Sequence, residues 1–203
     1  MPAQREEALA EGCEVDMEAI KQKIISGGMT VYKRKGPKFT MDDLASELSM
    51  SKKTIYTVYR DKKALLYDMV EYTFDEIKRA EQAVIDNEEL DTLGKLRGIL
   101  GVMPESFREM DFTVVDAVKD KYPEVYKRVN ERIESEWDTT LALLKQGIND
   151  GIFKEVNLPV FQMIYEATLE RFLHGNELKK NNVKYIDALN ELVDIMIDGI
   201  RTR

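Results

Sequence analysis

The side chains best suited to chemistry in this sequence gather between residues 52 and 57: Lys52, Lys53, Thr54, Tyr56 and Thr57. Long cations, hydroxyl groups and a phenol are side chains that reach the phosphates and base edges of nucleic acid. A lysine can donate to the O6 and N7 acceptors of guanine, and a threonine can contact a thymine methyl group or donate a hydrogen bond. These residue types predict DNA binding, with a solvated helix surface as the plain alternative.

Two short helices joined by a tight turn, within residues 40–62, are expected to position these side chains. Thr40, followed three residues later by Asp43, is typical of a capping box at the start of a helix. Residues 49–51 break this helix, and Ser51 can cap a second one. The apolar residues of the second helix recur at helical spacing and are expected to point inward: Ile55, Val58 and Tyr59. The pattern predicts a helix-turn-helix.

The charge of the chain is unevenly distributed, with a formal net charge of -8. Residues 1–20 carry one Arg against six acids, and residues 67–203 carry eighteen Lys and Arg against twenty-eight acids. Residues 21–66 carry eleven Lys and Arg against four acids. The basic segment is therefore the one that contains the helix-turn-helix. This segment can bind a polyanion, whereas the acidic body is repelled by it.

A helix is predicted from about Val15 to Arg34, ahead of the helix-turn-helix. Gly27-Gly28 interrupts its pattern, and because each glycine costs a helix interior about 1 kcal/mol, we expect a bend there or a later start. Gly36 and Pro37 predict the end, as a left-handed cap followed by a residue that cannot continue the helix. Lys38, in the same loop, can lie along a DNA backbone.

This order of elements resembles the TetR family of bacterial transcriptional regulators over roughly residues 20–70. The resemblance is carried by Phe39 to Ala45, Ser51 to Tyr56 and Asp61 to Leu66, after a first helix that ends in an aromatic residue, three others and a glycine. It implies an all-α protein, in which a three-helix DNA-binding domain is joined by a long helix to a helical ligand-binding and dimerisation domain. Ser49 departs from the family, which usually has glycine in the turn.

The resemblance also implies that Thr54, Tyr56 and Lys62 contact phosphates. Lys62 begins the following helix, capped by Asp61, and the helix dipole disfavours a cation there, so a nearby phosphate would account for it. The predicted DNA contacts are Lys38, Thr40, Lys52, Lys53, Thr54, Tyr56, Thr57 and Lys62.

Three segments are expected along the chain: a mobile N-terminal tail over residues 1–15, the DNA-binding domain over 16–66, and the ligand-binding and dimerisation domain over 67–203. A continuous apolar stripe over residues 61–86 predicts a linking helix roughly 37 Å long. We expect a shift at its far end to move the recognition helix.

The body beyond this helix has a helical pattern, with a single stripe from Tyr126 to Ile148 in the helix after Pro123. Its aromatic side chains are first of all core residues, and the resemblance implies that some of them line a pocket for a small-molecule effector. The candidate pocket residues are Met103, Phe107, Phe112, Tyr122, Trp137, Phe161 and Tyr165.

The last helix has an apolar arc wide enough to need two neighbours. One is the core of the body, and the other is expected to be the same helix of a second subunit, in a four-helix homodimer interface. A helix buried on two sides of a monomer is the alternative. The candidate interface residues are Phe172, Leu189, Leu192, Val193, Met196 and Ile200.

Catalytic and metal sites find little support in the sequence. His174, the single histidine, lies near Glu170 and Glu177, but such spacings are common by chance, so no metal is expected. No nucleophile with a local base and no phosphate-binding glycine loop is visible, and we expect neither enzyme activity nor a cofactor. The lone Cys13 and the lack of a secretory signal favour the cytoplasm, and no apolar run is long enough for a membrane span.

Together these features predict a dimeric transcriptional regulator of double-stranded DNA, which a small-molecule effector releases from a near-palindromic operator, and thus a repressor. The alternative from another class is an all-helical enzyme or small-molecule carrier in which the basic segment is incidental.

Overall fold

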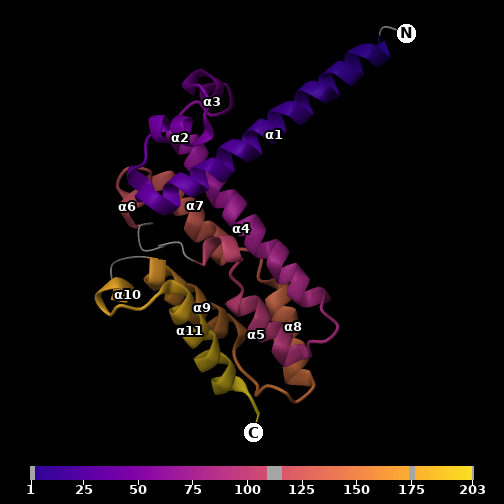
Figure 1. Cartoon of the computed structure of the whole chain (residues 1–203). Coiled ribbons are helices and arrows are strands. Elements are labelled where there is room, and N and C mark those ends of the chain that lie inside the picture. The colour runs from indigo at the N-terminus through magenta and orange to yellow at the C-terminus, as the bar shows by residue number, and fades with distance from the viewer. Residues whose placement is uncertain (1–2, 109–115, 174–176, 203) are drawn as a thin grey trace. The chain divides into compact units, whose positions relative to one another are not determined.

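The computed structural model describes residues 3–108, 116–173 and 177–202, and these residues form helices joined by short turns (Figure 1). One isolated antiparallel bridge joins Phe153 and Arg201, and the described residues contain no strand. The predicted all-α fold is therefore confirmed. The helices are α1 (Ala3–Lys35), η1 (Gly36–Lys38), α2 (Met41–Leu48), α3 (Lys52–Val58), α4 (Lys62–Asp86), α5 (Thr92–Gly101), η2 (Glu105–Phe107), α6 (Asp116–Lys119), α7 (Pro123–Glu134), α8 (Asp138–Asn149), α9 (Leu158–Leu173), α10 (Glu177–Lys180) and α11 (Tyr185–Ile200).

The chain divides into two compact units, Met1–Tyr72 and Thr73–Arg203. The sequence places this division slightly earlier, after residue 66. α4 is the helix that belongs to both units, and its bounds match the predicted linking helix closely. No helix among the described residues is long and apolar enough to span a membrane.

α1 is continuous through Gly27 and Gly28, so the expected late start is wrong, and a bend at these glycines stays a prediction. Its helical residues begin at Ala3, well ahead of the predicted start near Val15, whereas the mobility of the first residues stays a prediction. Both glycines are buried, and a Cβ on Gly27 would lie 2.5 Å from Cδ2 of Leu48 in α2. The glycines therefore let α2 and α4 approach α1 closely, and that packing outweighs their poor helix propensity.

The substitution Gly27→Ala is expected to lower the free energy of unfolding by about 1–3 kcal/mol, because the new methyl group clashes with the Leu48 side chain and forces it to move. Urea unfolding followed by circular dichroism measures this loss. Gly28→Ala is the matched control, and it should cost less because its nearest neighbour is the flexible end of Met69, 3.0 Å away. An unfolding midpoint equal to the wild type in Gly27→Ala would contradict this packing.

The first unit has a small apolar core shared by its four α-helices. Its fully buried side chains come from every helix and from the loop before α2: Ile24, Val31, Phe39, Leu44, Ile55 and Leu65. Burial of Ile55 confirms the predicted inward face of α3, and Tyr59 just after it is also buried. This shared core holds α3 in a fixed orientation against α1 and α2.

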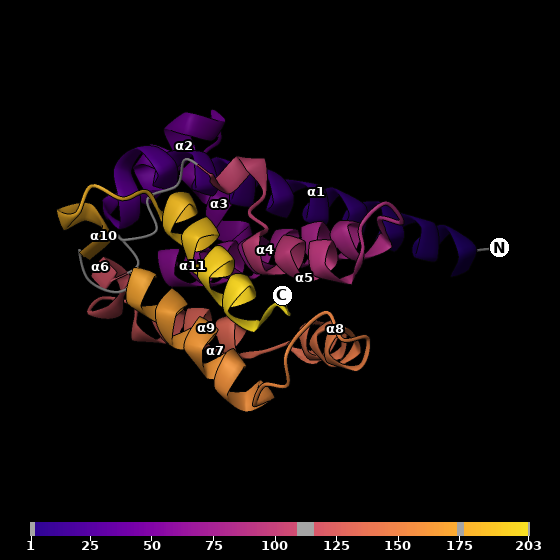
Figure 2. The ribbon, with the colours of Figure 1, turned by 90° about the horizontal axis from the view of Figure 1, so that it is seen from below.

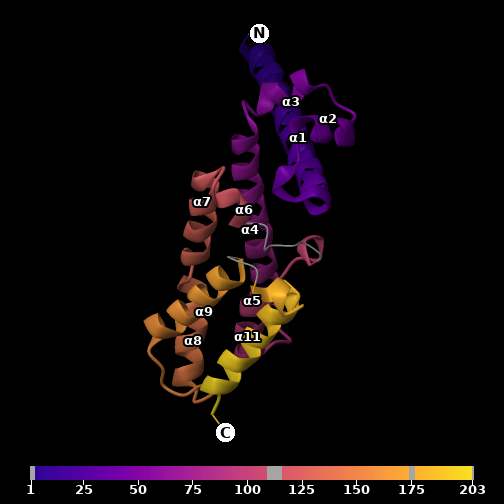
Figure 3. The same cartoon turned by 90° about the vertical axis from the view of Figure 1, so that its left-hand side faces the viewer.

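In the second unit, α5 packs against α8 and α11, and α9 packs against α7 and α11. α9 and α11 lie side by side in two perpendicular views (Figure 2, Figure 3). The single helix predicted after Pro123 is wrong, since α7 ends at Glu134 and α8 starts at Asp138. Glu136 between them has a φ of 64°, a left-handed conformation that cannot continue a right-handed helix.

Five of the six residues predicted for the subunit interface are already buried inside a single chain: Leu189, Leu192, Val193, Met196 and Ile200. This burial places them in the core of the second unit, and their contribution to a subunit interface stays a prediction. The sixth, Phe172, packs edge to face on Tyr185, with ring centroids 6.3 Å apart. The wide apolar arc of α11 is thus filled largely by neighbours from its own chain.

Candidate nucleic-acid interface

α2 begins with the predicted capping box. The Thr40 Oγ1 accepts a hydrogen bond from the Asp43 backbone N–H at 3.1 Å, and the Thr40 backbone N–H donates to Asp43 Oδ2 at 2.8 Å. The helix ends at Leu48, and Ser49 follows it with a φ of 51°, the left-handed conformation that glycine usually supplies in such a turn. The serine therefore keeps the tight turn that leads the chain into α3.

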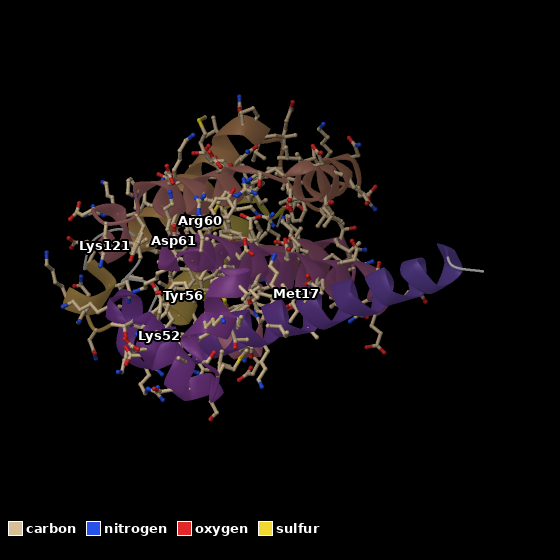
Figure 4. All side chains as sticks on the ribbon, turned by 90° about the horizontal axis from the view of Figure 1, so that it is seen from above. Met17, Lys52, Tyr56, Arg60, Asp61 and Lys121 are labelled. Atoms are coloured by element: carbon tan, nitrogen blue, oxygen red, sulfur yellow. The ribbon has the colours of Figure 1, made fainter. Side chains whose placement is uncertain are left out.

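α3 is capped by Ser51, whose Oγ accepts a hydrogen bond from the Thr54 backbone N–H at 3.1 Å, as predicted. Opposite the buried Ile55, the exposed face carries Lys52, Lys53, Tyr56 and Thr57. Figure 4 labels Lys52 and Tyr56 at two points along this face. Two cations, a phenol and a hydroxyl are thus presented to solvent on one short helix.

The two threonines of α3 also make local hydrogen bonds. The Thr54 Oγ1 lies 2.8 Å from the Ser51 Oγ, and the Thr57 Oγ1 donates to the Thr54 carbonyl oxygen at 2.6 Å. A hydroxyl has a single O–H, and a phosphate oxygen can only accept, so Thr54 can donate to a phosphate when Ser51 supplies the proton of their shared hydrogen bond. The Thr57 O–H is already used, but its oxygen can accept from a base and its methyl group can contact thymine. Their predicted contacts to phosphate and base therefore stay predictions, now with defined rotamers.

Two ion pairs fix α2 against the basic end of α1. The Arg34 guanidinium lies 2.8 Å from the Glu47 carboxylate, and the Lys35 ammonium lies 2.6 Å from the Asp43 carboxylate. The hydrogen bond from Lys35, with those from Thr40, lowers the pKa of Asp43 to about 2. These cations therefore have a structural role in orienting the helix-turn-helix, besides any effect on the helix dipole.

A third ion pair lies on the exposed face itself. The Lys52 Nζ is 2.5 Å from the Asp42 Oδ1, so the first turn of α2 is joined to the first turn of α3. The hydrogen bond to Asp42 raises the pKa of Lys52, which keeps this lysine charged. The other predicted cation of the loop, Lys38, lies in η1 and is exposed.

Lys62 is held by groups of its own unit. Its ammonium donates to the carbonyl oxygens of Pro37, at 2.6 Å, and Phe39, and it lies 4.0 Å from the centre of the Phe39 ring. These partners explain why a lysine is favoured at the start of α4 even without a phosphate. The helix-dipole argument for a phosphate beside Lys62 therefore no longer holds. They also anchor the loop between α1 and α2 to the start of α4, while the phosphate contact of Lys62 stays a prediction.

Replacing Lys62→Met is expected to lower the free energy of unfolding by about 1–3 kcal/mol, because two carbonyl oxygens lose their donor. Methionine retains the apolar stem over Phe39, so the loss reports on the ammonium group. Urea unfolding measures it, with Lys53→Met as the control at an exposed position. Equal unfolding midpoints in the two variants would rule out the anchoring role.

A chain of polar contacts supports the turn after α3. The Tyr59 hydroxyl donates to Asp68 Oδ2 at 3.1 Å, and the Lys21 ammonium lies 2.8 Å from the same carboxylate. Burial, together with the Asp68 charge, raises the pKa of Tyr59 well above its usual range, so the phenol remains protonated. The assignment of Tyr59 to the core of the small domain is therefore confirmed.

Arg60 is an exposed cation beside α3 that the sequence analysis missed. It follows the helix directly, and its Nε lies 3.4 Å from Asp61 Oδ2 (Figure 4). The signal available in the sequence was a basic residue next to the capping Asp61. Because Arg60 lies in the turn after α3, helical periodicity did not place it on the exposed face of that helix. Asp61 itself accepts from the Ala64 backbone N–H at 2.8 Å, which confirms it as the cap of α4.

The candidate pocket residues of the second unit lie mostly in its core. Met103, Phe107 and Phe161 are buried, and Tyr122 is half-buried. Phe112 lies outside the described residues, as does His174.

Trp137 and Tyr165, the other two pocket candidates, pack edge to face, with ring centroids 5.4 Å apart. The Tyr165 hydroxyl donates to the Leu100 carbonyl oxygen at 2.6 Å, and burial raises the pKa of this phenol. The two rings thus form one aromatic pair between the start of α8 and α9, and a role in ligand binding stays a prediction.

Comparison with known proteins matches the described geometry. The family model for bacterial regulatory proteins of the tetR family matches residues 24–69, which include α2, the turn and α3. A curated relative, the uncharacterized HTH-type transcriptional regulator YvaF of Bacillus subtilis strain 168, is 26% identical over 179 residues, 88% of this chain and 94% of its own length.

Solved structures share the fold. A TetR family transcriptional regulator from Cytophaga hutchinsonii has a TM-score of 0.71 and 18% identity, covering 93% of this chain and 98% of its own. FadR of Bacillus subtilis, in complex with stearoyl-CoA, has a TM-score of 0.60 and 15% identity, covering 89% of this chain and 99% of its own.

The family match falls on the segment that forms the capping box, the left-handed turn and the exposed face of α3, and the likeness in fold extends into the second unit. The relatives are transcriptional regulators, which removes the alternative of an enzyme with an incidental basic segment. Residues 24–69 form the DNA-binding domain of the tetR family of bacterial regulatory proteins, and the chain is a DNA-binding transcriptional regulator.

Proposed function

We propose that this protein is a homodimeric repressor that binds a near-palindromic operator and leaves it when a small molecule binds the second unit. The observation that carries the proposal is the exposed face of α3, where Lys52, Lys53 and Tyr56 stand on a helix fixed from behind by Ile55 and Tyr59. A recognition helix of a helix-turn-helix uses its N-terminal residues to contact base edges in the major groove.

The roles of the individual side chains follow from their chemistry. Lys52, Lys53 and Thr57 would contact base edges, and Thr54 and Tyr56 would bind phosphates on either side of the groove. Arg60, just beyond the helix, adds a further phosphate ligand. The remaining candidates for contacts to the DNA backbone are Lys38, Thr40 and Lys62.

Dimerisation is proposed through the apolar side chains that α9 and α11 leave exposed. On α9, Val160, Met163 and Ile164 are 45%, 56% and 50% exposed and follow helical spacing on one face. On α11, Ile195 is 64% exposed. Adjacent helices with exposed apolar residues of this size favour burial against a second copy, and two helices from each subunit would form a four-helix interface.

A small-molecule effector is proposed to bind the second unit. FadR of Bacillus subtilis, which shares the fold, is seen in complex with stearoyl-CoA, and this supports a ligand site in a helical unit of this kind. The apolar and aromatic candidates around Trp137 and Tyr165 suit a largely apolar effector. α4 belongs to both units, so we propose that it couples the effector to α3. The effector must bind the free and operator-bound states with different affinity.

Fluorescence anisotropy of labelled duplexes, titrated with the full chain at several salt concentrations, tests the proposal. The logarithm of the association constant should fall steeply with the logarithm of the salt concentration, by about 0.9 for each phosphate neutralised. The strongest duplex that the wild type selects from a random-sequence pool should bind at least roughly 1,000-fold more tightly than a scrambled duplex. Absence of a preference for any sequence would contradict the function.

A further inference from the structure

Asp42 brings a negative charge onto the face proposed to meet DNA. Its carboxylate is 68% exposed in the first turn of α2, where an acid is favoured by the helix dipole. A carboxylate close to phosphates costs binding energy, so its presence on this face needs a compensating role. Its partner, 2.5 Å away, is Lys52 at the first position of α3.

The pair restrains the lysine that stands nearest the N-terminus of the recognition helix. A lysine side chain has four rotatable bonds and would otherwise sweep over many positions, including those that reach any nearby phosphate. The ammonium has three N–H donors, and the carboxylate of Asp42 engages one side of it. Because Lys52 is still 50% exposed, its remaining donors can point into the groove while the pair stays formed.

Lys53 provides the internal comparison. It is the next residue and is also exposed, but among the described residues no carboxylate pairs with it. Of the two lysines at the start of α3, one is therefore held by the protein and the other is not. The held lysine is the one whose position is defined before DNA arrives.

We propose that Asp42 is a positioning residue, which aims Lys52 at a base edge and keeps it from binding phosphates of unrelated sequences. This inference rests on the proposed function of α3. On the operator the pair is retained and Lys52 donates its free N–H groups to base acceptors. On other duplexes the same pair prevents Lys52 from reaching the backbone, so one favourable contact is withheld. The effect of Asp42 is thus on sequence discrimination.

The test compares the wild type with Asp42→Asn on two probes, the strongest duplex that the wild type selects from a random-sequence pool and a scrambled duplex of the same composition. Asp42→Asn should bind the scrambled duplex more tightly, with a salt slope steeper by about 0.9 per protomer, because Lys52 now reaches a phosphate. The ratio of the two affinities should fall by roughly three- to tenfold. The urea midpoint should shift only slightly, because both side chains of the pair are at least half exposed.

Two further variants separate this effect from a general loss of negative charge. Glu47→Gln removes an acid from the same helix, but the partner of Glu47 is Arg34 on α1, so the ratio should stay at the wild-type value. In a Lys52→Ala background, Asp42→Asn should no longer change the ratio, because the residue it acts through is gone.

An equal rise in affinity for both duplexes in Asp42→Asn would overturn the inference, because it would mean that Asp42 only competes with DNA for Lys52. A fall in the affinity ratio in Glu47→Gln as large as that in Asp42→Asn would also overturn it. In either case the wild type still discriminates between the duplexes and the proposed function stands. A wild type that discriminates between no duplexes would overturn the proposed function, and this inference with it.

Discussion

The double variant Lys52→Ala, Lys53→Ala is expected to lose sequence-specific DNA binding, with an operator affinity reduced at least about 100-fold. Each good base contact from a recognition helix contributes about 1–3 kcal/mol of discrimination, and a dimer would lose four lysines at once. Both side chains are exposed, so the fold should be unaffected. Anisotropy titration of the selected operator duplex measures the loss, and circular dichroism checks the helix content.

The matched control is Lys179→Ala, Lys180→Ala, which removes the same two charges from exposed positions on α10 in the second unit. This variant should bind the operator within about twofold of the wild type, because both lysines lie outside the helix-turn-helix. If the α3 variant binds as well as the control, the recognition face has been assigned to the wrong residues.

Placing two carboxylates on the exposed face of α9, with Met163→Glu, Ile164→Glu, is expected to separate the dimer. Both residues are at least half exposed in a single chain, so the monomer tolerates the change. Burying unpaired carboxylates between subunits is strongly unfavourable, and each protomer would then bind only one half-site. Operator affinity should fall by about 100-fold or more, because the second half-site no longer binds at a high effective concentration.

Sedimentation velocity at micromolar concentration measures the oligomeric state in this experiment. Val183→Glu is the control, since it places a carboxylate at another exposed apolar residue outside α9 and α11. The control should sediment as a dimer and the double variant as a monomer. A wild type that sediments as a monomer, or a double variant that remains a dimer, would exclude this face as the interface.

The local features of the DNA-binding unit could be predicted from the sequence because they depend on neighbours a few residues apart. The capping box of Thr40 and Asp43, the cap of α3 by Ser51 and the left-handed Gly36 all follow this rule. The resemblance to the TetR family rests on the same short segments. The family model matches the same region.

Features that depend on residues distant in the sequence were predicted less well. Gly27 looked like a helix breaker because its packing partner Leu48 lies 21 positions away. Lys62 appeared to need a phosphate because the carbonyl oxygens that hold it belong to Pro37 and Phe39.

The apolar arc of α11 has the same limitation. Periodicity gives the width of an apolar face, but it does not say whether a neighbouring helix comes from the same chain or from a second one. In the structure, α5 and α9 of the same chain fill most of that arc. The exposed apolar residues that remain, Ile195 on α11 with Met163 and Ile164 on α9, could be identified only after this packing was known.

Selection of duplexes from a random-sequence pool by the full-length wild type tests the central claim most directly. The selected duplexes should contain a near-palindrome whose half-sites lie about one helical turn or slightly more apart, and sedimentation should give an even number of protomers on each duplex. The same selection with Lys52→Ala, Lys53→Ala should enrich no sequence. Enrichment of the same palindrome by the variant, or of none by the wild type, would contradict the account.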